Sequence, residues 1–328
     1  FTFSRSGTLA YIPGGARPRE EFALARVDRS GVVAPLPTPP RVYFQVRLAP
    51  DGSRAALDAV QKSGLAVFLA DVRTGVTTLL EQGEDPIWSP DGREVLFRRS
   101  GKGLFRRTVG EPGPAELVLG EAEYCVPVSW VDEAGGPTIV RLVRDSSGSP
   151  HYDIEQLSWD GAESSVRPLR ATPNEESFPE ISPDGRWLAY VSDESGQREV
   201  YLQSFPEETS RRQVSTVGGT DPAWSADGRE LFYITSKRDS QGRANMMSVR
   251  LLDSAPLRLT TPVVLFDYDT RELALGCFLR RCHDVAPDGQ GFYVAARVGA
   301  AVEAPDITHI NLVVNWAREL KARVPVGK

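Results

Sequence analysis

Ser182-Pro183-Asp184-Gly185-Arg186, followed by the apolar run Trp187-Leu188-Ala189-Tyr190-Val191, is the stretch that decides the fold. Its motif recurs along the chain in four further copies and two eroded ones. The copies begin at Ala49, Ser89, Ser225 and Ala286, and the eroded ones at Ser4 and Val131. The motif glycines lie 40 residues apart between Gly52 and Gly92 and 61 apart between Gly228 and Gly289. About 40 to 45 residues is the length that four short antiparallel strands need.

The motif predicts a tight turn between two strands. Asp-Gly between apolar runs is typical of hairpins, because the favoured turns need a positive φ, which glycine tolerates. The preceding proline has no backbone N–H to give to a ladder, so it marks the end of the first strand. Large apolar residues such as Trp88 and Trp224 stand just before the turn. We expect them to pack between neighbouring sheets.

Seven such units predict an all-β fold, a seven-bladed β-propeller of four-stranded antiparallel blades in one domain over residues 1–328. Six blades are the alternative if the first or fourth copy is not a full blade. The predicted seventh blade lacks a fourth strand, a place that a strand from the other terminus, upstream of Phe1, commonly takes in such rings. The expected blades are 1–40, 41–82, 83–121, 122–172, 173–216, 217–266 and 267–314.

The tail after the last strand has a helical pattern. Trp316, Leu320 and Val324 recur at four-residue spacing with basic residues between them. This spacing predicts a short amphipathic helix over about 315–323. We expect this helix to cap the propeller, because so short a helix needs tertiary packing to persist. Binding of a partner is the alternative.

Composition excludes two classes of partner. The net charge is −6 and charged residues make up 25% of the chain. Lysines and arginines are scattered over many loops, so there is no basic stripe for a nucleic-acid backbone. No run approaches the roughly 20 apolar residues that span a bilayer. We therefore expect no nucleic-acid binding and no membrane insertion by this fragment, which is predicted to be monomeric in isolation.

The three cysteines are too few for a disulfide framework. Cys277 and Cys282 would pin the loop that enters the last blade if they formed a disulfide in an oxidising compartment, and two thiols are the other interpretation. A metal site made from these two cysteines and His283 matches no standard spacing. No metal or cofactor is predicted.

Catalytic signatures are missing from the sequence. It contains no Gly-x-Ser-x-Gly, His-Glu-x-x-His or Cys-x-x-Cys pattern and no phosphate-binding glycine loop. His151, His283 and His309 are the only histidines. A triad assembled from different blades would be recognised by geometry and not by sequence. No nucleophile is assigned, and the fragment is expected not to be an enzyme.

The motif with its preceding aromatic, together with the segment 192–201 that follows it, resembles the TolB-like propeller repeats of bacterial envelope proteins, and the resemblance covers all seven units. The ending 307–316, Ile-Thr-His-Ile-Asn-Leu-Val-Val-Asn-Trp, is similar to the end of propeller regions appended to bacterial membrane serine/threonine protein kinases. This resemblance implies an extracytoplasmic, periplasmic-side sensor tethered by a membrane helix upstream of residue 1. The first and fourth copies depart from the pattern, which puts the blade boundaries in doubt there.

Function on a propeller is expected in its loops, because the blades are interchangeable structure. The rim opposite the Asp-Gly turns collects the varied loops and several acidic residues. It would suit a cationic peptide segment or a cation; for each residue alone, a solvated loop is the other interpretation. The predicted ligand-binding residues are Tyr43, Glu84, Asp85, Glu123, Tyr124, Glu175, Glu176, Phe178, Asp221, Arg280 and Arg281.

Three functions stay open from the sequence. The first is a non-catalytic domain that binds a protein, peptide or glycan ligand at the loop rim, most simply as the sensor of a receptor-type kinase. The second is a TolB-like envelope scaffold that docks a protein partner. The third is a propeller hydrolase or lyase, which the scarcity of histidines disfavours.

Overall fold

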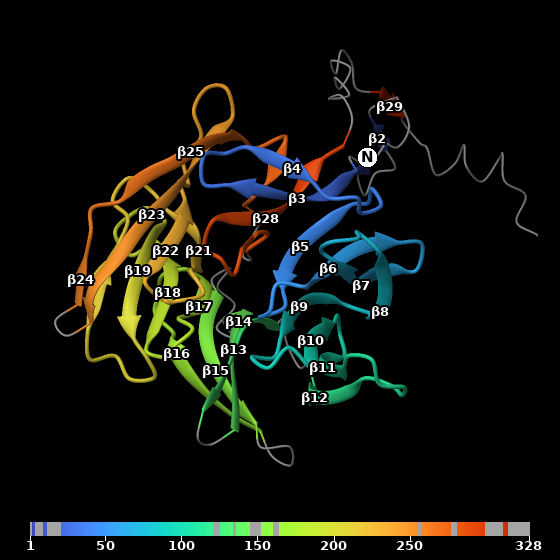
Figure 1. Cartoon of the computed structure of the whole chain (residues 1–328), viewed down its shortest axis with the longest axis horizontal. Helices are drawn as coiled ribbons and strands as arrows, with labels where there is room; N and C mark the ends of the chain where they lie inside the picture. Colours follow the sequence, from blue (N-terminus) through green and yellow to red (C-terminus); the bar gives the residue numbers. More distant parts are fainter. Residues whose placement is uncertain are drawn as a thin grey trace, which may run out of the picture. The chain divides into compact units, whose positions relative to one another are not determined.

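In a computed structural model of the chain, all regular structure in the described residues is β-strand, and every strand pair in it is antiparallel, as the sequence predicts (Figure 1). The structure describes residues 2–3, 9–11, 21–120, 125–133, 136–144, 152–159, 164–254, 257–276, 281–298 and 311–313. The chain divides into two compact units. They are Phe1–Glu20 with Gly299–Lys328, and Glu21–Val298.

Five sheets of the larger unit are each built from consecutive strands. The first contains β5 (Tyr43–Leu48), β6 (Arg54–Gln61), β7 (Gly64–Asp71) and β8 (Thr77–Gln82). The second contains β9 (Glu84–Trp88), β10 (Glu94–Arg99), β11 (Gly103–Thr108) and β12 (Glu116–Gly120). The third contains β13 (Cys125–Glu133), β14 (Gly136–Arg144), β15 (Tyr152–Trp159) and β16 (Ser164–Arg170).

The other two of these five follow the same order. One contains β17 (Glu176–Ile181), β18 (Trp187–Ser192), β19 (Glu199–Ser204) and β20 (Arg211–Gln213). The next contains β21 (Thr220–Trp224), β22 (Glu230–Ile234), β23 (Arg243–Ser254), β24 (Leu257–Leu259) and β25 (Val263–Asp269). Both β24 and β25 pair with the long strand β23.

A further sheet joins the two ends of the larger unit. Its inner strands are β26 (Leu273–Ala274), β27 (Asp284–Val285) and β28 (Gly291–Arg297), and its outer strands are β3 (Phe22–Asp28) and β4 (Val33–Pro35). In Figure 1 the blue strands β3 and β4 therefore lie beside the red strand β28. A strand from the N-terminal side does complete the last blade, but it comes from residues 22–35 and not from upstream of Phe1.

The expected count of seven blades, with six as the alternative, is wrong. Five blades are continuous in sequence, neither seven nor six, because the predicted units 1–40 and 267–314 each contribute strands to one shared sheet. The reason is the pairing of β3 with β28, which runs unbroken from Gly291↔Asp28 to Arg297↔Phe22. Ala23, Leu24, Ala25 and Val27 of β3 are buried, so the second half of the predicted first blade stabilises the last blade.

Hydrophobic clusters lie between neighbouring sheets and close the larger unit into a ring. One cluster joins Leu24 and Ala295 of the shared sheet to the sheet of β5–β8, and another joins Phe292 to Phe232 in the sheet of β21–β25. Contacts between innermost strands run from β5 through β9, β13, β17 and β21 to β27 and back to β5. The larger unit is therefore a propeller-like ring.

The motif turns have the predicted mechanism. In the copy at Ser89, the Gly92 N–H donates to the Ser89 carbonyl over 2.9 Å, and Gly92 has a φ of 69°. The Ser89 hydroxyl donates to Asp91 Oδ1 over 2.6 Å and accepts the Glu94 N–H over 2.9 Å. Asp91 Oδ1 also accepts the Arg93 N–H. The turn therefore satisfies its own polar groups before the second strand begins.

The smaller unit has one described sheet. It contains β1 (Thr2–Phe3), β2 (Leu9–Tyr11) and β29 (Asn311–Val313), with β2 in the middle. The predicted helix at 315–323 lies outside the described residues, as do Cys277, His151 and His309. Within the described part of the chain, nothing helical has the length and apolar character needed to cross a bilayer.

Candidate ligand-binding site in the hub

Most of the innermost strands present one residue each to the centre of the ring. This residue stands five positions before the turn glycine, and we call these places the hub positions. The next residue, four before the glycine, points between sheets, because successive side chains of a strand alternate. The hub positions that line the pocket described below hold Arg47, Ile87, Glu180 and Asp284, and Ser129 takes this place in β13, where the motif is eroded. The corresponding residue of β21, Ala223, packs between sheets instead.

A cavity of about 600 Å³, here called the hub pocket, lies on the turn side of the ring. All six innermost strands of the ring contribute to its lining. Its mouth carries the motif prolines, and its walls carry apolar side chains from between the sheets. The lining includes Pro50, Pro90, Pro183, Pro287, Ile87, Trp88, Val128, Trp130, Ile181, Trp224 and Val285.

The floor of the hub pocket is charged. Arg281 Nη2 lies 3.1 Å from Glu180 Oε1 and 3.2 Å from Asp284 Oδ1. Asp284 also accepts the backbone N–H groups of Leu48 over 2.7 Å and of Val285 over 2.9 Å. Burial raises the pKa of the Glu180 carboxyl, while Arg281 and Arg47 act in the opposite direction. A buried ion pair of this kind stabilises the ring only while both partners are present.

Arg47 is the charged floor residue with the fewest partners. It is 4% exposed, and its one hydrogen bond is a long contact of 3.5 Å from Nη1 to the His283 carbonyl. Within the described residues, its Nε and Nη2 have no hydrogen-bond partner. Burial, and then the charge of Arg281, lower the pKa of the Arg47 guanidinium to about 10. Arg47 therefore stays a cation at neutral pH.

The segment before β27 holds this floor in place. Cys282 is disulfide-bonded, while Cys277, its predicted partner, lies outside the described residues. His283 is fully buried, with Nδ1 2.8 Å from the Leu275 carbonyl. Burial, followed by the charge of Arg281, lowers the pKa of His283 to about 3, so its ring is neutral. In the described part of the chain, no group of three or more His, Cys, Asp or Glu side chains is placed to hold a metal ion.

Several predicted rim residues are buried. Asp85, Phe178 and Asp221 each precede a proline and have φ values of 57°, 51° and 54°. They lie where the innermost strand shifts its register against the second strand. Tyr43 is also buried, and its hydroxyl donates to the Pro39 carbonyl over 2.8 Å. The rings of Tyr43 and Phe178 are therefore shielded from solvent, and their ligand-binding role stays a prediction.

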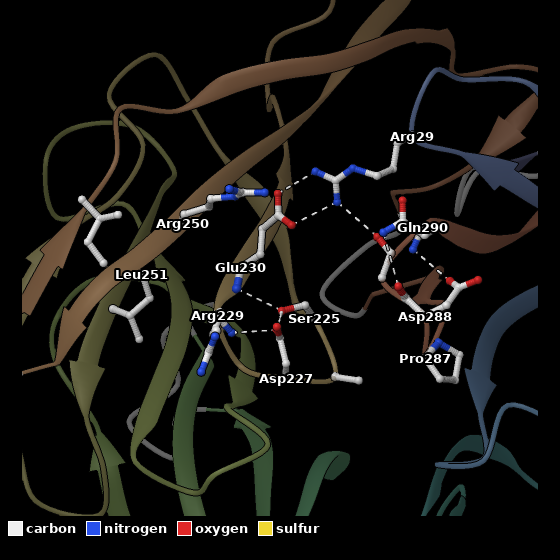
Figure 2. Close-up of a pocket in the computed structure, with 13 residues that line it drawn as sticks. Arg29, Ser225, Asp227, Arg229, Glu230, Arg250, Leu251, Pro287, Asp288 and Gln290 are labelled. Atoms are coloured by element: carbon white, nitrogen blue, oxygen red, sulfur yellow. Dashed lines mark hydrogen bonds and ion pairs between the residues drawn. The ribbon is translucent and has the colours of Figure 1, made fainter.

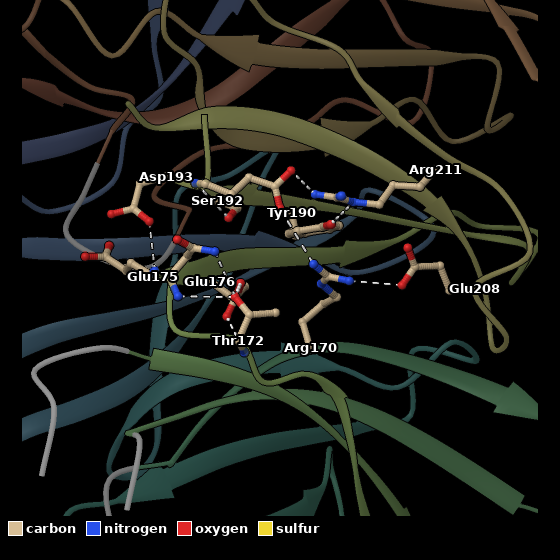
Figure 3. Close-up of polar contacts among 11 residues, drawn as sticks. Arg170, Thr172, Glu175, Glu176, Tyr190, Ser192, Asp193, Glu208 and Arg211 are labelled. Atoms are coloured by element: carbon tan, nitrogen blue, oxygen red, sulfur yellow. Dashed lines mark hydrogen bonds and ion pairs between the residues drawn. The ribbon is translucent and has the colours of Figure 1, made fainter. Parts of the chain in front are cut away.

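The predicted acidic rim residues are engaged within the protein. Glu84 binds Arg98 over 2.7 Å. Figure 3 shows Glu175, whose backbone N–H donates to Asp193, and Glu176, which accepts the Thr172 hydroxyl. Glu175 also forms an ion pair with Arg198, and burial raises the pKa of the Glu176 carboxyl. Their ligand-binding role stays a prediction.

The remaining predicted residues divide between the hub and the part not described. Arg281 lines the hub pocket, whereas Glu123, Tyr124 and Arg280 lie outside the described residues. Three charged residues of the pocket, Arg47, Glu180 and Asp284, are not among the residues predicted from the sequence. Their signal was a charged residue at the same distance before the turn glycine in strands that are otherwise apolar.

A second cavity, of about 660 Å³, lies between two neighbouring turns (Figure 2). Arg29, just after β3, binds both oxygens of Glu230 over 3.0 and 2.7 Å and donates to the Gly289 carbonyl. Glu230 also accepts the Ser248 hydroxyl. These contacts join the shared sheet to the sheet of β21–β25, so the Arg29–Glu230 pair of this cavity is used for structure. We therefore take the hub pocket as the stronger candidate site.

No protein-family model matches the chain. An uncharacterized protein from Agrobacterium fabrum is 24% identical over 192 residues, which cover 54% of this chain and 58% of that protein. The match therefore spans less than two thirds of the relative's length.

Solved structures show the fold more clearly. A TolB structure from Agrobacterium tumefaciens has a TM-score of 0.62 at 15% identity, over 86% of this chain and 100% of that one. TolB from Acinetobacter baumannii has a TM-score of 0.54 at 15% identity, over 87% of this chain and 65% of that one. A puromycin-hydrolyzing peptidase from Mycobacterium tuberculosis has a TM-score of 0.53 at 19% identity, over 78% of this chain and 44% of that one. The chain has a TolB-like β-propeller fold, and at these identities the likeness concerns the fold alone.

Proposed function

We propose that this propeller is a non-catalytic binding module and that a segment of a protein or peptide ligand enters the hub pocket. The observation that carries the proposal is the cavity of about 600 Å³ at the centre of the ring, which every innermost strand of the ring lines. Concave sites with mostly apolar walls and a few converging polar groups are the usual form of ligand sites. The hub pocket combines proline and tryptophan walls with a charged floor.

The charges of the floor favour binding over catalysis. Glu180 and Asp284 are both paired with Arg281, and Asp284 also accepts two backbone N–H groups. A general acid or base needs to exchange a proton with a substrate within hydrogen-bond reach. Carboxylates held in this way are better suited to fix charge at the floor, which makes a hydrolase or lyase the less favoured function.

For the whole protein we propose a sensor role on the extracytoplasmic side, in a receptor-type serine/threonine kinase of a bacterial membrane. The support is the kinase-propeller-like ending over 307–316 together with the TolB-like fold. A TolB-like envelope scaffold is the second candidate, and the same fold favours it. The natural sequence before Phe1 separates the two: a kinase domain and a membrane helix support the sensor, while a secretory leader alone supports the scaffold.

Thermal-shift screening of the chain against a peptide library tests the binding function. A ligand that prefers the folded state raises its free energy of unfolding by about 2.7 kcal/mol at a concentration of 100 Kd. Ala226 lies exposed at the mouth of the hub pocket, so Ala226→Trp should block entry and abolish the shift. Val76 is 63% exposed and does not line the pocket, which makes Val76→Trp the matched control. A shift that survives Ala226→Trp would place the ligand elsewhere.

A further inference from the structure

We propose that the hub pocket recognises a carboxylate on an apolar peptide segment and that Arg47 is the residue that pairs with it. This inference rests on the proposed binding function and names the chemistry of the ligand. Arg47 lines the pocket at a hub position, is 4% exposed, and keeps two donor atoms without a partner in the described residues.

The charges of the floor are distributed unequally between two arginines. Arg281 is within 3.2 Å of both carboxylates, Glu180 and Asp284. Arg47 contacts neither of them within ion-pair distance in the described residues, and its one hydrogen bond, to a backbone carbonyl, is 3.5 Å long. A buried cation without a paired anion is costly. The Arg47 guanidinium is therefore the floor group with which a ligand can pair, and the ligand must supply an anion to do so.

The geometry of the buried, unpartnered donors selects a carboxylate. Nε and Nη2 lie on the same edge of a guanidinium, and on Arg47 these are the two atoms without a partner. Two parallel N–H donors on one edge match the two oxygens of a carboxylate in a bidentate pair. The same pair formed away from solvent is stronger than at an exposed site, because the surrounding dielectric is lower.

The walls select what carries the carboxylate. Above the floor the pocket is lined by Ile87, Ile181 and Val285, and its mouth by motif prolines such as Pro50 and Pro183. An apolar side chain gains free energy when it is buried against such walls. An apolar peptide segment fits them, and it can supply its carboxylate either from its C-terminus or from an acidic side chain.

Three probe peptides test the proposal by calorimetric titration of the folded chain. They are acetyl-Leu-Pro-Leu with a free carboxylate, the same peptide as its amide, and acetyl-Leu-Glu-Leu as its amide. We expect a carboxylate-bearing probe to bind about tenfold more tightly than the neutral amide, since one charge-assisted bidentate pair is worth at least this factor. The first and third probes separate a C-terminal from a side-chain carboxylate.

Arg47→Met removes the charge and keeps the length of the side chain. In this variant the affinity for the acid peptide should be about equal to the affinity for the amide peptide, and the amide should still bind. Arg93, whose side chain is 82% exposed and does not line the pocket, gives the control variant Arg93→Met, which should keep the ratio. Glu180→Gln removes one negative charge from the floor and should tighten binding of the acid several-fold relative to the amide. This second variant tests the proposal even if Arg47→Met does not fold.

The outcomes separate the two proposals. Equal binding of acids and amide by the unmodified chain, or a ratio that survives Arg47→Met, would overturn carboxylate recognition and leave the hub pocket as a binding site. A smaller ratio of acid to amide affinity in Glu180→Gln than in the unmodified chain would also contradict carboxylate recognition. If no probe binds to the unmodified chain, while the peptide library gives a shift that Ala226→Trp abolishes, the binding function stands and the carboxylate inference fails. No binding in either experiment contradicts both.

Discussion

Two neighbouring positions on each innermost strand have opposite characters. Five residues before the turn glycine, at the hub positions, the side chain changes from Arg47 in β5 to Glu180 in β17. Four residues before the glycine it stays large and apolar, as with Trp88 and Trp224. The pleat of the strand turns the two positions to opposite faces. Arg47, Glu180 and Asp284 therefore line the hub pocket, while Trp88 and Trp224 pack between sheets. The residue that packs between sheets stays apolar from blade to blade, whereas the residue at the hub position is free to vary.

The largest effect is expected at the position between sheets. Trp224 packs against the sheet of β17–β20, and its Nε1 donates to the Glu180 carbonyl over 3.3 Å. Trp88 donates to the Arg47 carbonyl in the same way over 3.0 Å. Trp224→Ala should therefore lower the free energy of unfolding by about 3–5 kcal/mol, because it leaves a cavity and an orphaned carbonyl. Urea denaturation measures the loss.

A matched truncation on the surface is the control for this variant. Val263 is 55% exposed on β25, and Val263→Ala should change the free energy of unfolding by less than about 0.5 kcal/mol. A loss below about 1 kcal/mol in Trp224→Ala would mean that the tryptophan does not hold the two sheets together, and the division between the two positions would fail.

The second effect compares the two buried arginines of the hub. Arg281→Met leaves Glu180 and Asp284 without their common partner, and should cost about 3 kcal/mol, as the loss of one member of a buried ion pair does. Arg47→Met removes a buried cation that lacks such a partner. It should change the free energy of unfolding by less than about 1 kcal/mol or raise it. Denaturation of both variants at neutral pH is the measurement, and equal losses would contradict the unequal pairing.

Much of the fold was predictable from the sequence because its signals are local. The Ser-Pro-Asp-Gly turn needs only five neighbouring residues, and its hydrogen bonds around Ser89 and Asp91 are those that the motif implies. Which strands share a sheet at the closure is not local. Strand β3 pairs with β28 across most of the chain, and either terminal unit has the alternating pattern that fits this place. The number of consecutive blades was therefore beyond the reach of the pattern.

The site was less predictable than the fold. The sequence shows that Glu175 and Glu176 lie in a loop between strands, but not that Arg198 and Thr172 engage them. Burial of Asp85 and Asp221 depends on a bulge in the innermost strand. The proline after each of them is compatible with a bulge, but it does not show that the preceding side chain is buried. The charged hub positions were visible in the sequence. Recognising them required the spacing from the glycine to be combined with the alternation of the strand.

The third effect is a pH dependence that arises next to the hub. His283 has a folded-state pKa of about 3 against an ordinary value of 6.5. Between these values the unfolded chain binds a proton that the folded chain does not, so the free energy of unfolding should fall by about 1.4 kcal/mol for each pH unit below 6.5. His283→Gln keeps a donor for the Leu275 carbonyl and removes this slope. Denaturation at pH 7.0, 6.0 and 5.0 measures it.

A slope between pH 7 and 5 that is the same in both proteins would show that His283 is solvated or protonated in the folded state. Carboxyl groups with lowered pKa values, such as Asp269 at about 2, lose their contribution only at lower pH. Their stabilisation is present above the unfolded pKa and disappears as the pH falls toward the folded value. They do not disturb this comparison.

The smallest effect concerns the turn that separates each hub strand from the next strand. In the copy at Ser89 the hydroxyl bonds to Asp91 and to the Glu94 N–H, and Ser89→Ala should lower the free energy of unfolding by about 1 kcal/mol. The copy at Ala286 lacks this hydroxyl by nature. Ala286→Ser places an oxygen near the turn Asp288 and should raise the free energy of unfolding by about 0.5 kcal/mol. Opposite signs in the two denaturation curves would show that the repeated turns are interchangeable structure. The same sign in both would mean that the turn chemistry depends on the sheet that carries it, and the distinction between scaffold and hub would then have to be drawn blade by blade.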